Sequence, residues 1–124
     1  MFKLISFSTK KKIQNNFSDL LQQLYKEIEF DTEFNPIIKF PETLNKDTPL
    51  VICFHGLTSN PNQYEAFIKS NSTEIFISLA LPGHYNSKPE TLRQFSQDNT
   101  YFTEHITTFI KKTNHPTHVI GTSA

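Results

Sequence analysis

The chain has 124 residues, and its 12 Lys and Arg residues balance 12 Asp and Glu residues. This length fits one domain, and the 12 Phe residues indicate a folded protein rather than a disordered one. The balanced charge gives no electrostatic reason to expect nucleic acid or an anionic membrane as a partner. No run approaches the roughly 18 apolar residues of a membrane span, and we find no secretory signal, so we expect a cytoplasmic protein.

Residues 1–31 are predicted to form an N-terminal tail and one amphipathic helix. Apolar residues recur at helical spacing from Phe17 to Ile28, and Asn16 is a plausible N-cap. The basic run Lys10-Lys11-Lys12 is expected to be a solvated part of the tail. We expect one face of the helix to pack against the core, with a partner-binding helix as the alternative.

Residues 32–124 alternate between β-rich and helical patterns. Residues 29–40 favour one or two short strands, and residues 50–54 form a continuous apolar run that is typical of a strand covered on both faces. Asn60-Pro61 then supplies an N-cap and a first-turn proline for a helix. Three more elements are predicted, namely strands at 74–81 and 117–120 and a helix at 101–112. This alternation predicts an α/β fold with a mostly parallel sheet and flanking helices.

The single cysteine, Cys53, lies within the apolar run 50–54, so we expect a buried and reduced thiol. The five histidines are dispersed, and no cysteine pair accompanies them, so no metal site is predicted. The three glycines lack the spacing of a phosphate-binding loop. We therefore expect neither a metal nor a cofactor.

Three motifs follow the predicted strands. His55-Gly56 follows the first apolar strand, Leu81-Pro82-Gly83-His84 ends the second, and Gly121-Thr122-Ser123-Ala124 ends the third. The last motif resembles a nucleophile elbow, G-x-S-x-G, in which a serine sits on a strained turn between strand and helix. In this order the motifs resemble the N-terminal half of the α/β-hydrolase fold, in its monoacylglycerol lipase, esterase and serine aminopeptidase branch, over about residues 32–124.

This resemblance implies a serine hydrolase of carboxylic esters with Ser123 as the nucleophile. The backbone N–H groups of Leu57 and Ala124 would form the oxyanion hole, and His55 and Gly56 would belong to the oxyanion loop. Such donors stabilise the negative charge of a tetrahedral intermediate. The implied substrate is a small-molecule ester or acyl compound. Tyr85 stands where relatives usually carry a glycine.

The family order of the triad is serine, then acid, then histidine, which would place the acid and the histidine after Ala124. His84, near the expected rim of the site, could substitute as a base, whereas Asp98 is expected to cap a helix. We therefore expect this chain to be inactive alone as a truncated α/β-hydrolase fold. The alternative is a non-catalytic hydrolase-like chain without function or one that pairs with a C-terminal half or self-associates through an exposed edge strand.

Overall fold

The computed structural model describes residues 2–28, 35–56, 60–80 and 100–121. Three α-helices and a short 3-10 helix are present in these ranges, namely α1 (Phe2–Ile28), η1 (Pro61–Tyr64), α2 (Glu65–Lys69) and α4 (Thr100–Thr113). The strands are β1 (Ile37–Lys39), β2 (Leu50–Phe54), β3 (Ile75–Leu79) and β4 (Thr117–Gly121). The predicted strand at 50–54 is confirmed with the same bounds, and the strands and helix predicted after residue 73 are confirmed with small shifts at their ends.

The four strands form one mixed sheet in the order β1-β3-β2-β4. Strand β2 is parallel to β3 and to β4, whereas β1 is antiparallel to β3. In this register Phe54 at the end of β2 pairs with Leu79 of β3 and with Gly121 of β4. The three parallel strands therefore end at the same edge of the sheet. The predicted α/β class with a mostly parallel sheet is confirmed.

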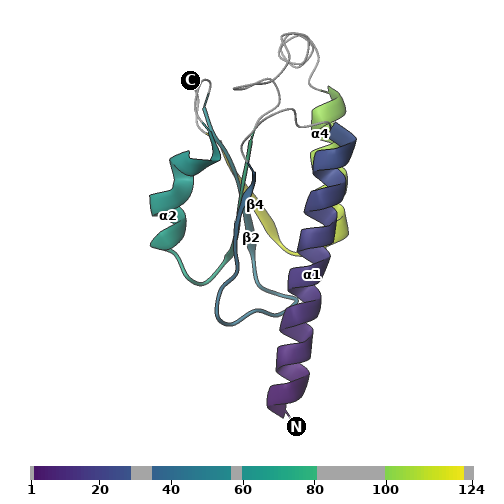
Figure 1. The fold of residues 1–124 in the computed structure, drawn as a ribbon, viewed down its shortest axis with the longest axis vertical. Helices are drawn as coiled ribbons and strands as arrows, with labels where there is room; N and C mark the ends of the chain where they lie inside the picture. The colour runs from purple at the N-terminus through teal and green to yellow at the C-terminus, as the bar shows by residue number, and fades with distance from the viewer. Residues whose placement is uncertain (1, 29–34, 57–59, 81–99, 122–124) are drawn as a thin grey trace.

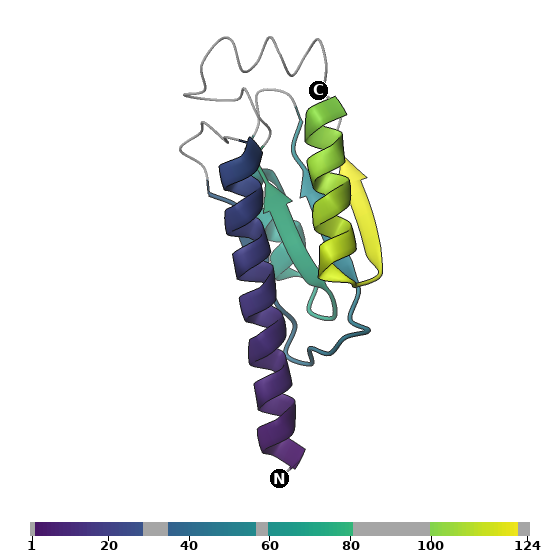
Figure 2. The same ribbon diagram turned by 90° about the vertical axis from the view of Figure 1, so that its right-hand side faces the viewer.

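The sheet lies between two helical layers (Figures 1 and 2). Helices α1 and α4 lie side by side on one face, and η1 and α2 cover the other. Because successive strand residues point to opposite faces, β2 and β3 each contribute to two cores. The larger core joins the sheet to α1 and α4, and its fully buried strand residues are Leu50, Ile52, Ile75, Ile77 and Leu79. The smaller core joins the sheet to η1 and α2 through Val51, Cys53, Tyr64, Ile68 and Phe76.

Helix α1 is much longer than predicted, since it begins at Phe2 rather than after Asn16. The basic run at 10–12 is therefore part of a helix, and Asn16 is not an N-cap. Two contacts explain this difference, because Ile13 packs against the larger core and the Lys10 ammonium donates to the Glu42 carbonyl at 2.9 Å. The packing role of the C-terminal half is confirmed by the buried residues Phe17, Leu21, Leu24 and Ile28.

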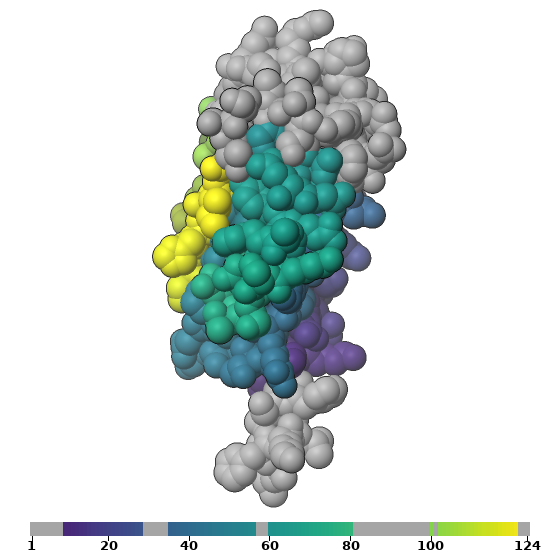
Figure 3. Space-filling view, turned by 90° about the vertical axis from the view of Figure 1, so that its left-hand side faces the viewer, coloured from purple at the N-terminus to yellow at the C-terminus, as the bar shows by residue number. Residues whose placement is uncertain are grey.

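Strand β4 is an edge of the described sheet. It pairs with β2 on one side, and no strand pairs with its other side among residues that the structure describes. Val119 is 55% exposed, and Figure 3 shows β4 at the margin of the face that carries α2. Within the described ranges no helix has both the length and the apolar character needed to cross a membrane.

Candidate active site

The residues predicted to carry chemistry fall into two groups. His55 and Gly56 lie in the described part of the chain, whereas Leu57, Ser123 and Ala124 lie outside the described residues, as do His84 and Asp98. What the structure does show is where the two motif-bearing segments start. Because Phe54 pairs with Gly121 across parallel strands, the chain leaves β2 and β4 from adjacent positions at one edge of the sheet.

His55 is buried, and its ring is hydrogen-bonded to a backbone carbonyl. Its side chain is 2% exposed, and Nδ1 lies 2.8 Å from the carbonyl oxygen of Gly56. A carbonyl can only accept a hydrogen bond, so Nδ1 carries the proton in this contact. The geometry therefore agrees with a structural role for His55 in the loop after β2.

Side chains of η1 hold the backbone at the end of β2. The Tyr64 hydroxyl donates to the carbonyl of Phe54 at 2.9 Å, and the backbone N–H of Gly56 donates to Oε1 of Gln63 at 3.0 Å. Backbone N–H and C=O groups that are withdrawn from water need such partners. With the ring of His55 on the Gly56 carbonyl, three backbone polar groups of Phe54 and Gly56 are held by side chains.

The 3-10 helix that supplies these side chains is itself fixed in place. Oδ1 of Asn60 accepts from the N–H of Asn62 at 2.8 Å, and Pro61 occupies the first turn, so the predicted N-cap and proline are confirmed. The Ser78 hydroxyl donates to the carbonyl of Pro61 at 2.8 Å, and both residues are fully buried. This bond ties η1 to strand β3. The loop after β2 is thus connected through η1 to the neighbouring strand.

The tip of β3 is held from the other side of the sheet. The N–H of Ala80, the residue after β3, donates to the hydroxyl oxygen of Tyr25 on α1 at 3.2 Å. Burial raises the pKa of Tyr25 to about 12, against a smaller lowering by this hydrogen bond, so the phenol is neutral at physiological pH. Tyr25 therefore acts here as a structural anchor.

Cys53 is fully buried in β2, one residue before Phe54. Burial raises the pKa of its thiol to about 11, which keeps it in the unreactive neutral form near pH 7. The expectation of a buried cysteine is confirmed, and its thiol is a poor nucleophile.

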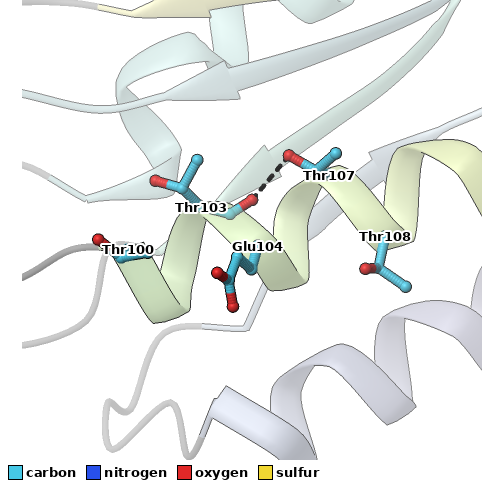
Figure 4. A pocket seen from close by; sticks show the side chains of 5 residues that line it. All are labelled: Thr100, Thr103, Glu104, Thr107 and Thr108. Carbon is cyan, nitrogen blue, oxygen red and sulfur yellow. Dashed lines mark hydrogen bonds between the residues drawn. The ribbon is translucent and has the colours of Figure 1, made fainter.

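Other candidate sites in the described part of the chain are weaker. No group of three or more His, Cys, Asp and Glu residues there could hold a metal ion. A hollow on α4 is lined by Glu104 and four threonines (Figure 4). The Thr107 hydroxyl in it donates to the carbonyl of Thr103 at 2.8 Å, which is a bond within the helix. A second groove, between α1 and β1, is lined in part by Tyr25, Ile38 and Phe40. Neither hollow has a described histidine or cysteine in its lining.

The hydrogen bonds of Gln63, Tyr64 and Ser78 around β2 were not predicted from the sequence. Ser78 carried a signal, because a serine inside the apolar run 75–80 implies a buried hydroxyl that needs a partner. Gln63 and Tyr64 carried none, because their partners depend on how η1 folds back on β2. No family model, curated protein or solved structure matches this chain.

Proposed function

We propose that this chain carries the nucleophile and the oxyanion hole of a serine hydrolase that acts on carboxylic esters. Ser123 is the nucleophile, and the N–H groups of Leu57 and Ala124 are the oxyanion donors. The observation that carries the proposal is the register of β2 with β4, in which Phe54 pairs with Gly121. A loop donor that follows β2 and a serine that follows β4 then start from neighbouring strand ends, as the chemistry requires.

The arrangement of the strands also supports the resemblance to α/β-hydrolases. One antiparallel strand beside three parallel strands, two of which lead into the His-Gly and Gly-Thr-Ser-Ala segments, is compatible with the sheet of that fold. In that fold one oxyanion donor comes from a loop that follows a strand, and the nucleophile lies in the turn after another strand. In the proposed assignment, β2 and β4 correspond to these two strands.

The reaction would proceed by attack of the Ser123 oxygen on the ester carbonyl carbon. A histidine would take the serine proton and return it to the leaving alcohol, while the two N–H groups bind the oxyanion. In the family order this histidine and its acid come after the elbow, outside residues 1–124. His55 is a poor substitute, because it is almost fully buried in the loop after β2. His84, the other histidine that the sequence suggests as a base, lies outside the described residues.

A serine-to-cysteine substitution tests this half of the site without a base. A thiol is a few per cent thiolate near pH 7, so Ser123→Cys supplies its own nucleophile. The thiolate would attack the carbonyl of p-nitrophenyl acetate, and p-nitrophenolate would leave as the thioester forms. Alkylation of the same thiol by iodoacetamide forms no oxyanion, so the ratio of acylation to alkylation rates reports the oxyanion hole alone.

The matched control is Ser72→Cys, at an exposed serine in the loop before β3. We expect the rate ratio at position 123 to exceed that at position 72 by about 100-fold, the effect of one oxyanion donor. Cys53 should add little background, because its pKa is about 11 and its side chain is buried. Equal ratios at positions 123 and 72 would contradict the proposed function.

The second candidate function is a non-catalytic chain that associates through the edge of β4. The exposed Val119 and the unpaired side of β4 within the described sheet favour this alternative. An open strand edge with an apolar residue can pair with another chain. Size-exclusion chromatography with light scattering should then show a dimer that Val119→Lys dissociates. A compact monomer that unfolds cooperatively would count against this alternative.

A further inference from the structure

We infer that the N-terminal part of α1, residues 2–12, binds the surface of a membrane that contains anionic lipids. This part of the helix combines a cluster of lysines with apolar residues, and it lies beyond the core that holds the rest of α1. The inference is independent of the proposed function. The three parallel strands point away from this end of α1, towards the edge of the sheet that carries His55 and Gly56 (Figure 2).

The N-terminal part of α1 extends past the body of the protein. At 1.5 Å per residue, the 27 residues of α1 span about 40 Å. In both ribbon views this end of the helix runs beyond the sheet and beyond the end of α4 (Figures 1 and 2). Among the side chains that the structure describes, Ile13 is the first residue of α1 that packs against the larger core. Residues 2–12 are therefore placed where a flat surface can reach them.

The charge of this part of the helix differs from that of the rest of the chain. Residues 1–18 contain four of the 12 Lys and Arg residues and none of the 12 Asp and Glu residues, so the remainder of the chain has four more acidic than basic residues. Lys11 and Lys12 are exposed, and Lys10 is half-buried and donates to the Glu42 carbonyl. The charge that balances over the whole chain is thus separated along it. This separation would turn the N-terminal part of α1 towards an anionic surface.

The apolar residues of the same segment favour a lipid surface over other polyanions. Four of the six positions from 2 to 7 are apolar, namely Phe2, Leu4, Ile5 and Phe7. These positions belong to the helix, which begins at Phe2. A nucleic acid would attract the lysines through its phosphates and would not need the apolar residues. Apolar residues together with lysines in one helical segment are typical of helices that bind the interface of anionic membranes.

Binding to lipid vesicles tests the inference in the 124-residue chain. Flotation measures the partition coefficient with vesicles of phosphatidylcholine alone and with vesicles in which about a third of the lipid is phosphatidylglycerol. Each lysine near an anionic surface strengthens binding about fivefold. We therefore expect the parent chain to prefer the anionic vesicles by at least about 25-fold, and Lys11→Gln/Lys12→Gln to bind them about 25-fold more weakly than the parent.

The matched control is Lys26→Gln/Lys69→Gln, which removes the same charge from two exposed lysines elsewhere. Lys26 lies on the same helix, about 21 Å from Lys12 along its axis, whereas the Debye length is about 8 Å at physiological salt. Lys69 lies on α2, on the other face of the sheet. This control should weaken binding to the anionic vesicles less than about twofold.

A second pair of variants tests the apolar residues. Phe7→Ser should weaken binding to the anionic vesicles about 10-fold, because less apolar surface is withdrawn from water. Phe67→Ser makes the same change at a phenylalanine that is 42% exposed on α2, and it should leave binding unchanged. Circular dichroism verifies that both variants keep the helical content of the parent.

Five results would overturn the inference. Three come from the vesicles, namely equal binding to the two kinds of vesicle, an equal loss in the two lysine variants, and a Phe7→Ser chain that binds as the parent does. The fourth is a parent chain that binds a double-stranded DNA oligomer as tightly as the anionic vesicles, which would indicate a general polyanion site. The fifth is a dimer without vesicles that Phe7→Ser dissociates, since a second copy would then cover this part of α1.

Discussion

Replacement of Phe17 by alanine tests whether α1 is an integral part of the fold. The Phe17 side chain is fully buried, and its ring lies 5.8 Å from that of Phe40 and 5.3 Å from that of His115. It thereby joins α1 to the segment after β1 and to the loop before β4. A buried Phe→Ala change costs about 3–5 kcal/mol, and the better helix propensity of alanine returns about 0.5 kcal/mol. We expect the free energy of unfolding to fall by about 3–4 kcal/mol.

Urea unfolding followed by circular dichroism measures this loss as a lower midpoint at unchanged slope. The matched control is Phe67→Ala, because Phe67 is 42% exposed on α2 and contacts Phe76 edge-on at 5.6 Å between ring centroids. This exposed ring should cost at most about 1.5 kcal/mol. The reasoning about α1 is refuted if Phe17→Ala destabilises the chain no more than Phe67→Ala does.

Other changes probe single hydrogen bonds and titrating groups. Ser78→Ala removes the donor to the buried Pro61 carbonyl, so the urea-derived free energy of unfolding should fall by about 1–3 kcal/mol, and an unchanged midpoint would contradict this. Asn114 follows α4 and has a φ of 57°, a left-handed conformation that glycine adopts most easily. Asn114→Gly should therefore raise the melting temperature, and Asn114→Ala should lower it by the equivalent of about 1 kcal/mol. A higher melting temperature for Asn114→Ala than for Asn114→Gly would contradict this. Burial raises the pKa of Cys53 from 9.0 to about 11 and that of Tyr25 from 10.0 to about 12, so the native state keeps protons that the unfolded chain releases. The stability that these two groups contribute should be complete below about pH 9 and should decrease as the pH rises towards about 12. The urea midpoint should therefore fall between about pH 9 and 12, and it should fall less in Cys53→Ala and in Tyr25→Phe. A midpoint that depends on pH equally in the parent and in both variants would contradict this.

The elements that the sequence predicts well are those with a strong local pattern. Strand β2 is one, because burial on both faces requires a continuous apolar run. The N-terminal half of α1 is the main miss. Its lysines are good helix formers, but a search for apolar residues at helical spacing does not detect them. Its described contact with the core comes from Ile13. The antiparallel direction of β1 was not predicted either, because three residues do not encode which strand they will pair with.

The candidate site divides in the same way. The common edge for the ends of β2, β3 and β4 follows from the alternation of strands and helices, since parallel strands joined by helical crossovers end on one side. The anchors do not follow from it. The contacts of Gln63 with Gly56 and of Tyr64 with Phe54 join residues seven and ten positions apart, and only the folded path of η1 brings them together.

Backbone hydrogen bonding is enough to explain why Gln63, Tyr64 and Ser78 lie at the strand ends. Each side chain is the partner of a backbone group that burial would otherwise leave without one. For Tyr64 and Ser78, which are buried, loss of the hydroxyl should therefore appear first as lost stability. The same reasoning applies to Gln63, because its side chain is exposed but Gly56 is buried, so removal of the acceptor leaves a buried N–H without this partner. Gln63→Leu should then lower the urea-derived free energy of unfolding by about 1–3 kcal/mol. An unchanged urea midpoint in Gln63→Leu would contradict this account of the Gly56 N–H.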